Sequence, residues 1–283
     1  MIEELFSERI RAANPTNELE QELLLQELME QHILASLSRA GFFSTVQFHG
    51  GTCLRIFHAL PRFSEDLDFM TTLPDPGFRW QRYLSQVQQD CRRDGIEFEV
   101  QDKAQSWGAV QKAFLKTDSI GKLITLTLPF ARFQKRKLHI KLEIDTNPPA
   151  GAEPEIRFLQ FPVTLPVTAQ ALPTSFAGKC HALLCREYVK GRDWFDFLWY
   201  TARKTPVNFP LLQNALAQQG PWQGTNNAVD TAWLQKVLAV KINSIDWRLA
   251  ADDVARFLPA REQEGLPHWS RELFLQRVEG MAL

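Results

Sequence analysis

The sequence predicts an α+β (α/β) fold, in which a mixed β-sheet flanked by helices is followed by an all-helical C-terminal domain. Through the first half of the chain, short runs alternate apolar and polar residues, which is typical of half-buried strands. Prolines then interrupt residues 147–175, and beyond them the apolar residues recur at helical spacing. We therefore expect a sheet domain over residues 1–173 and a helical domain over residues 174–283.

The first half is expected to interleave helices with at least five strands. Thr16 or Asn17 can cap the first helix, and Gly41 suits its end. Pro61 ends the second helix, and Gly95 ends the third. In chain order the expected elements are helix 18–40, strand 44–48, helix 52–60, strand 66–70, helix 77–94 and strands 96–100, 123–130 and 138–144.

The second half contains no strand pattern after the prolines, and the sequence has no internal repeat or low-complexity tract. Its apolar residues follow the 3.6-residue period of a helix in several successive stretches. These expected helices cover residues 174–189, 193–204, 208–218, 228–242, 250–258 and 269–280.

Composition excludes several classes of protein. With 32 basic and 33 acidic residues and a net charge of -1, the chain is neither a strongly basic nucleic-acid coat nor an acidic disordered tail. No apolar run reaches the roughly 18–20 residues that span a bilayer, and residues 1–11 lack the apolar core of a signal peptide. The spacing of Cys53, Cys91, Cys180 and Cys185 matches no zinc site. We expect reduced thiols in a cytoplasmic protein with no membrane contact.

The segment Gly50-Gly51-Thr52 stands between an expected strand and an expected helix. Glycines let the backbone approach a ligand closely, and the start of a helix offers free N–H groups and a positive dipole end to an anion. Thr52 adds a hydroxyl there. Taken alone, the segment is more often an ordinary turn than a phosphate-binding site.

Asp66 and Asp68 lie two residues apart on the next expected strand, so their side chains share one face. Two adjacent carboxylates repel each other unless a cation lies between them, and Mg²⁺ prefers such oxygen ligands. With the preceding glycine turn, the pair indicates a metal site for a phosphate substrate. The alternative is an exposed Asp-x-Asp at the edge of a strand.

A third carboxylate could come from Asp145 or Glu143, which share a face at the end of the strand 138–144. We expect Asp145 to be the metal ligand, because the carboxyl ends of strands are where ligands gather in open sheets. A basic patch lies just upstream and could contact the phosphates of a nucleic acid, or be a solvated loop. It comprises Arg132, Lys135, Arg136, Lys137 and Lys141.

Lys179, Arg186, Lys190 and Asp193 would fall on one helix face if a single helix ran through them, although Gly191 could break it. In that arrangement Lys179 would contact a phosphate, and Asp193 would orient Lys179 or accept a proton. The alternative is a set of surface ion pairs among Arg192, Asp193 and Asp196.

Together these segments resemble the AbiEii/AbiGii family of nucleotidyltransferase toxins, within the DNA polymerase β-like nucleotidyltransferase superfamily. The resemblance rests on the runs His49–Arg55 and Leu60–Phe69, and on a second block over Lys179–Leu184 and Arg192–Asp196. It covers residues from about 30 to 260, with Thr52 where serine is common.

The resemblance implies a toxin of a type IV toxin–antitoxin pair, linked to abortive infection and phage defence. Such proteins use a nucleoside triphosphate (NTP) with Mg²⁺ or Mn²⁺, and some relatives modify tRNA, so the resemblance implies an RNA acceptor and a cognate antitoxin partner. By position, Ser64, Asp66, Asp68, Lys179 and Asp193 match catalytic residues. Asp66, Asp68 and Asp145 are the expected metal ligands, and the nucleotide would contact Gly50, Gly51, Thr52, Ser64 and Lys179.

Two alternatives share the superfamily core. An aminoglycoside-type nucleotidyltransferase would modify a small cationic molecule, and it would need an acidic pocket where this sequence has the basic patch. A non-catalytic nucleotide-binding protein would have no need of the acids, and unpaired acids cost stability.

Overall fold

The computed structural model of the chain describes residues 2–102, 119–128, 136–225 and 228–281. By their contacts the residues form two units, which we name the sheet unit (Met1–Ala59, Phe63–Pro148 and Glu155–Ala169) and the helical unit (Leu60–Arg62, Pro149–Pro154 and Gln170–Leu283). The main change of unit falls at residue 169, where we expected a boundary at 173. The short segment at 149–154 joins the helical unit because the Asn208 side chain donates a hydrogen bond to the Gly151 carbonyl at 2.8 Å.

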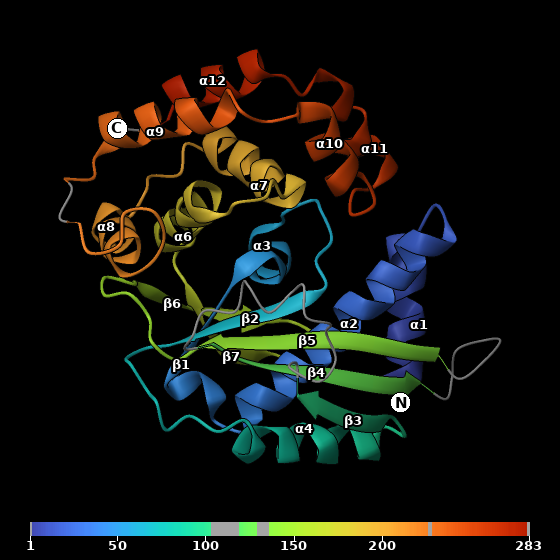
Figure 1. Cartoon of the computed structure of the whole chain (residues 1–283). Coiled ribbons are helices and arrows are strands. Elements are labelled where there is room, and N and C mark those ends of the chain that lie inside the picture. The colour runs from blue at the N-terminus through green and yellow to red at the C-terminus, as the bar shows by residue number, and fades with distance from the viewer. Residues whose placement is uncertain (1, 103–118, 129–135, 226–227, 282–283) are drawn as a thin grey trace. The chain divides into compact units, whose positions relative to one another are not determined.

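The sheet unit contains a mixed sheet with strand order β3-β4-β5-β2-β1-β7-β6 in the described part of the chain. Strands β2 and β5 pair in parallel at its middle, whereas β1 and β2 are antiparallel (Figure 1). The elements are α1 (Ile2–Ala13), α2 (Glu18–Arg39), η1 (Phe42–Ser44), β1 (Val46–His49), α3 (Gly50–His58), β2 (Asp66–Thr71), α4 (Gln81–Arg93), β3 (Glu97–Asp102), β4 (Ser119–Leu128), β5 (Arg136–Asp145), β6 (Pro154–Leu159) and β7 (Leu165–Gln170).

The predicted fold class is confirmed, but the sequence did not indicate α1, β6 or β7. Strands β6 and β7 lie in the proline-interrupted stretch, to which the sequence assigned no strand. Proline fits there because Pro154 is the first residue of β6, and β6 is an edge strand with no further partner in the described sheet.

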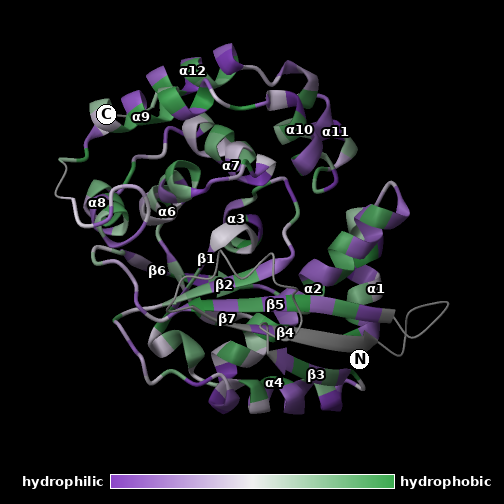
Figure 2. Cartoon of the chain, viewed as in Figure 1, coloured by the Kyte–Doolittle hydropathy of each residue, from purple (hydrophilic) through white to green (hydrophobic). Residues whose placement is uncertain are grey.

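One face of the sheet carries the apolar core. Leu67 and Phe69 of β2 and alternate residues of β5 are buried there against α2 and α4. An aromatic cluster joins these layers, with the Phe42 ring 4.9 Å from Phe69 and stacked on Trp80 at 5.6 Å. Figure 2 shows hydrophobic and hydrophilic residues mixed along β5 and along α4, as expected of elements with only one buried face.

The helical unit has the predicted helices, each within a few residues of its expected bounds. They are α6 (Leu172–Cys185), α7 (Gly191–Ala202), α8 (Phe209–Gln218), α9 (Thr231–Ile242), α10 (Trp247–Ala255) and α12 (Arg271–Glu279), with short turns α11 (Ala260–Gln263) and η3 (Leu266–His268). Aromatic side chains fill its core. Trp247 stacks on Phe274 at 3.8 Å, and Trp194 packs edge-on against both rings.

Neither unit contains, within the described residues, a helix that combines the length and the apolar character needed to cross a bilayer.

Gly50 is the residue that lets α3 begin directly above β2. Its φ is +79°, and a Cβ added there would lie 3.0 Å from the Asp68 Cβ and would collide with the carboxylate oxygen Oδ2. The close packing of α3 against the Asp68 carboxylate is therefore possible only because residue 50 has no side chain. Gly41 has a similar φ of +73° but nothing within 4 Å of an added Cβ, which makes it a matched control.

We predict that Gly50→Ala destabilises the chain by roughly 2–4 kcal/mol, because it combines a left-handed backbone with a steric collision. Gly41→Ala should cost only about 1 kcal/mol, because it has the left-handed backbone alone. Denaturant unfolding of both variants measures the difference, and equal losses would contradict the close approach to Asp68.

Candidate functional site

The two acids predicted to bind metal lie side by side on β2, with two charged residues of β5 opposite them. In the parallel register Asp66 pairs with Lys141, and Asp68 pairs with Glu143. The Lys141 ammonium lies 3.0 Å from Glu143 Oε2 and 3.9 Å from Asp66 Oδ2. On the other side, β1 places His49 opposite Asp68. The result is a patch of charged groups on the face opposite the apolar core.

Negative charge predominates around Asp68. Burial raises the pKa of Asp68 above its ordinary value, and the charges of Asp66 and Glu143 raise it further. His49 and Lys141 oppose this rise without cancelling it. Burial acts to lower the pKa of Lys141, but attraction to Asp66 and Glu143 outweighs burial and raises it. Asp68 is therefore a carboxylate whose charge is incompletely compensated.

The β2–β5 register bears on the choice between the two candidates for the third carboxylate. Glu143 lies directly opposite Asp68, whereas Asp145 lies opposite Met70, one pleat further along. Asp145 is buried, and its Oδ1 accepts a hydrogen bond from the Asn147 N–H at 3.0 Å. The register thus favours Glu143, the candidate that we ranked second, and our assignment of Asp145 stays a prediction.

These donors fit a divalent cation that a substrate also helps to bind. No group of three or more His, Cys, Asp or Glu side chains among the described residues could hold a metal ion. Mg²⁺ commonly takes one or two carboxylates and completes its shell with phosphate oxygens and water. Asp66 and Asp68 supply such a pair, and the glycine at position 50 lets the start of α3 pack closely against the Asp68 carboxylate.

The helix start predicted to bind phosphate is α3, which begins at Gly50. Its N-cap residue, His49, provides no side-chain cap within the described structure. The first N–H groups of α3 are therefore the available donors. The Thr52 hydroxyl is buried and donates a hydrogen bond to the Asp66 carbonyl at 2.5 Å, which connects α3 to β2. Because this hydroxyl is already engaged, the nucleotide contact that we predicted for Thr52 would be made by its backbone N–H. Ser64, also buried, lies just before β2.

Only part of the predicted basic patch can be located. Arg132 and Lys135 lie outside the described residues. Lys137 is exposed, but Lys141 contacts Glu143 and Asp66 instead of forming an open basic surface. Lys141 thus belongs to the acid cluster, which the sequence could not indicate because the strand register was unknown.

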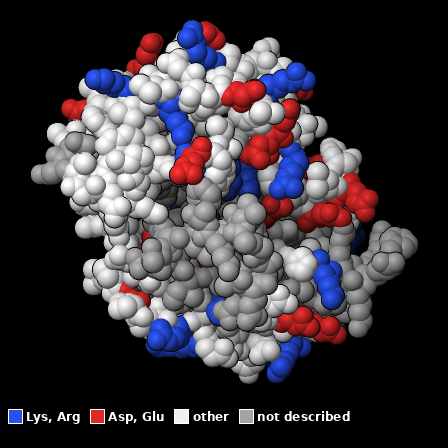
Figure 3. All heavy atoms as spheres, in the orientation of Figure 1, with Lys and Arg blue, Asp and Glu red and all other residues white. Residues whose placement is uncertain are grey.

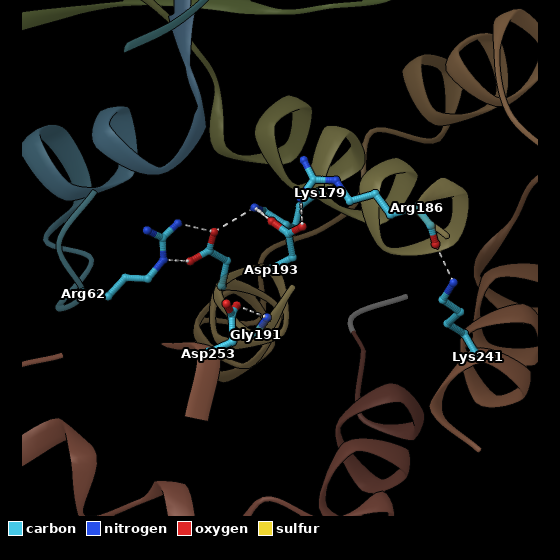
Figure 4. A network of polar contacts seen from close by, with 8 residues as sticks. Arg62, Lys179, Arg186, Gly191, Asp193, Lys241 and Asp253 are labelled. Atoms are coloured by element: carbon cyan, nitrogen blue, oxygen red, sulfur yellow. Dashed lines mark hydrogen bonds and ion pairs between the residues drawn. The ribbon is translucent and has the colours of Figure 1, made fainter. Parts of the chain in front are cut away.

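The helical unit holds the second set of predicted residues in a buried ionic network (Figure 4). Asp193 accepts a hydrogen bond from Lys179 at 2.6 Å and one from Arg186 at 2.5 Å. Asp196 lies 2.8 Å from Lys179 and also binds Arg62 through two hydrogen bonds of 2.6 and 2.7 Å. Lys179 thus bridges two aspartates, each of which also binds an arginine.

The structure corrects two interpretations of this segment. No single helix carries all four predicted residues, because α6 ends at Cys185 and α7 begins at Gly191. A Cβ at Gly191 would collide with the Ala250 carbonyl, so this glycine also allows α7 to approach α10. The surface ion-pair interpretation is wrong, because Asp193 and Asp196 are only 4% and 0% exposed.

The sequence did not single out Arg62 and Asp196 as members of this site. Arg62 lies far from the other members along the chain, so no spacing rule relates them. Its only sequence signal is its position in the run that resembles the toxin family.

The network makes both aspartates strong acids. Burial acts to raise the pKa of Asp193, but Lys179 and Arg186 outweigh it and hold that pKa well below its ordinary value. For Asp196, Arg62 and Lys179 have the same effect. A carboxyl group whose pKa is lower in the folded than in the unfolded state stabilises the fold when it is charged. This stabilisation is complete above the unfolded pKa of about 3.9 and is lost as the pH falls through the pKa of the folded state.

We predict that Asp196→Asn costs about 3–5 kcal/mol at pH 7, because it leaves Arg62 and Lys179 buried with reduced compensation. The variant should also lose less stability than the parent when the pH falls below about 4. Tryptophan fluorescence during denaturation is a suitable measurement, since six of the eight tryptophans lie in the helical unit. Asp252→Asn removes an exposed acid of the same unit and should change little. An acid sensitivity of Asp196→Asn equal to that of the parent would contradict the network.

Comparison with known proteins identifies the family. The family model "Nucleotidyl transferase AbiEii toxin, Type IV TA system" matches residues 32–277. No curated protein matches the chain. Among solved structures, JHP933 from Helicobacter pylori is similar at 16% identity over 92% of this chain and 88% of its own, with a TM-score of 0.47. A structure described as "putative nucleotidyltransferase from H. pylori" is similar at 15% identity over 90% and 98%, with a TM-score of 0.46.

At 15–16% identity and TM-scores below 0.5, these two structures do not establish the function of this chain. The family match, by contrast, includes both the Gly50–Asp68 segment and the Lys179–Asp196 segment and spans most of the sequence. The chain therefore belongs to the AbiEii family of nucleotidyltransferase toxins of type IV toxin–antitoxin systems.

Proposed function

We propose that this protein transfers a nucleoside monophosphate from an NTP to an RNA acceptor, tRNA, with Mg²⁺ or Mn²⁺ held by Asp66 and Asp68. The observation that carries the proposal is the crowded acid pair on β2, where Asp68 has a raised pKa and packs against the start of α3 at Gly50. A carboxylate in that state is unfavourable for the fold alone and favourable once a cation binds.

In the proposed reaction, backbone N–H groups at the start of α3 and the Ser64 hydroxyl donate hydrogen bonds to phosphate oxygens of the NTP. When bound, the metal ion neutralises the charge that develops on the α-phosphate and on the pyrophosphate. Glu143 and Asp145 are the candidates to complete its carboxylate ligands. The acceptor hydroxyl forms its new bond to the α-phosphorus as the bond to the pyrophosphate oxygen breaks, and the hydroxyl proton passes to solvent water.

Lys179 and Asp193 have distinct roles in this proposal. Lys179 binds phosphate oxygens through its ammonium group, whose pKa is raised despite burial by Asp193 and Asp196 and which is therefore charged at neutral pH. Asp193 holds that ammonium at 2.6 Å. A carboxylate with a pKa lowered by two cations is a poor proton acceptor, so we assign Asp193 to positioning Lys179 instead of to general-base catalysis.

Family membership supports the remaining parts of the proposal. A type IV toxin implies a cognate antitoxin partner and a role in abortive infection against phage, with action in the cytoplasm, where tRNA, NTPs and Mg²⁺ are present. On the face in Figure 3, basic and acidic side chains of the described residues are interspersed and do not form a broad basic surface.

The activity test is incubation of the protein with each labelled NTP and, separately, tRNA, total RNA and an aminoglycoside. We expect labelled tRNA and released pyrophosphate, no transfer by Asp66→Asn, and a loss of about 10²-fold or more in turnover for Lys179→Ala, since one electrostatic stabiliser is removed. Nucleotide binding without incorporation would instead favour the non-catalytic alternative. Label found only in the aminoglycoside would favour the drug-modifying one.

We also predict that Asp68→Asn stabilises the protein while abolishing transfer. A pKa raised in the folded state means that the charged carboxylate destabilises the fold above its unfolded pKa of about 3.9, and asparagine removes that charge. The thermal midpoint at pH 7 should rise by roughly 2 °C or more.

In the same assay, Mn²⁺ with a non-hydrolysable NTP should stabilise the parent protein and leave Asp68→Asn unchanged. Glu99→Gln, an exposed position of the same unit, is the control for a general effect of removing one acid. An Asp68→Asn protein that melts below the parent would show that Asp68 is a structural residue.

A further inference from the structure

Lys190 is a cationic residue that the proposed reaction does not use. It is the N-cap residue of α7, and its carbonyl accepts the N–H of Asp193 at 2.9 Å. Its side chain is half-buried, and its ammonium forms no hydrogen bond or ion pair with the residues that the structure describes. A half-buried ammonium without a partner is unfavourable, because it has lost hydration without gaining a bond.

The charges around Lys190 do not compensate it. Asp193 attracts its ammonium, while Arg192, Arg186 and Lys179 repel it. Asp193 already accepts hydrogen bonds from both Lys179 and Arg186. Burial, together with the three cations and against the attraction of Asp193, lowers the pKa of Lys190 to about 8.

Other groups nearby do not supply the missing negative charge. At the start of α7, Asp253 is engaged by the Gly191 N–H at 2.7 Å. At the end of α6, Lys241 donates to the Arg186 carbonyl at 2.7 Å and brings one more positive charge (Figure 4). The same segment carries Glu187, which is exposed. The Lys190 ammonium therefore lies near the Arg186 guanidinium with no acid paired to it, which is the chemistry that binds phosphate.

We propose that the Lys190 ammonium, together with the Arg186 guanidinium, forms a phosphate-binding subsite of the helical unit. Its ligand is a phosphate group of a substrate, from either the triphosphate of the NTP or the backbone of the RNA. This inference rests on the proposed function only for the identity of those substrates. Binding of an inorganic polyphosphate tests the subsite without turnover.

The experiment is calorimetric titration of the full chain with inorganic triphosphate and, separately, with a short single-stranded RNA. Lys190→Met removes the charge and keeps the length of the side chain, whereas Lys190→Arg keeps the charge. Lys236→Met is the matched control, an exposed lysine of the same unit. Because Lys190 forms no ion pair within the described structure, Lys190→Met should keep the parent's circular dichroism spectrum and melt at or above the parent's melting temperature.

We expect Lys190→Met to weaken the binding of at least one probe by about tenfold, and Lys190→Arg and Lys236→Met to stay within about twofold of the parent. If Lys190→Met binds triphosphate more weakly, the subsite binds a phosphate of the nucleotide. If it binds RNA more weakly, the subsite binds a phosphate of the acceptor. Because Lys190 loses its proton near pH 8, the parent's affinity relative to Lys190→Arg should fall between pH 7 and pH 9. Comparison of the two proteins at each pH cancels the titration of the phosphate itself.

Unchanged affinity of Lys190→Met for both probes would overturn the inference, even if nucleotide transfer is found. Conversely, the protein could bind triphosphate through Lys190 and show no nucleotide transfer. That result would support the subsite and refute the proposed reaction. The two proposals can therefore fail independently.

Discussion

The sheet unit depends on the register between β2 and β5, which brings several mutually repelling carboxylates to one face. Parallel pairing with period-two side chains places Asp66 and Asp68 beside Lys141 and Glu143, and any shift of one residue would place these charges in the apolar core. Burial of Leu67 and Phe69 on the other face fixes that register. The same hydrophobic packing that stabilises the sheet therefore forces the acids together.

Lys141 limits the cost of this crowding but does not remove it. Its single positive charge lies between Glu143 and Asp66, and the pKa of Asp68 stays raised. Asp68 differs in this respect from Asp193 and Asp196, whose pKa values are lowered by cations of their own unit. Acids with complete ionic partners stabilise a fold, and acids without them are typical of sites where a cation binds.

The helical unit uses charge in the opposite way. There Lys179 is fixed by two buried aspartates, so its ammonium keeps one position and loses little freedom when it meets a ligand. The two arginines that complete the network maintain the charge of those aspartates. Between α6 and α7, by contrast, Lys190 has no such partner among the described residues.

The sequence by itself determined the order and type of most elements, because apolar periodicity reflects which face of each helix or strand is buried. It also predicted that Asp66 and Asp68 lie on one face, since this holds for residues two apart on a strand whatever the rest of the sheet does. It missed β6 and β7, where edge and terminal positions tolerate the prolines that normally argue against strands.

Only the tertiary structure decided which distant residues meet. The partnership of Lys141 and Glu143 with the β2 acids depends on strand register, and that of Arg62 with Asp196 joins positions 134 residues apart. Burial likewise changed Asp193 and Asp196 from plausible surface ion pairs into the core of a network. Local periodicity reports the face on which a side chain lies, whereas its partners and its pKa depend on long-range packing, which no local pattern records.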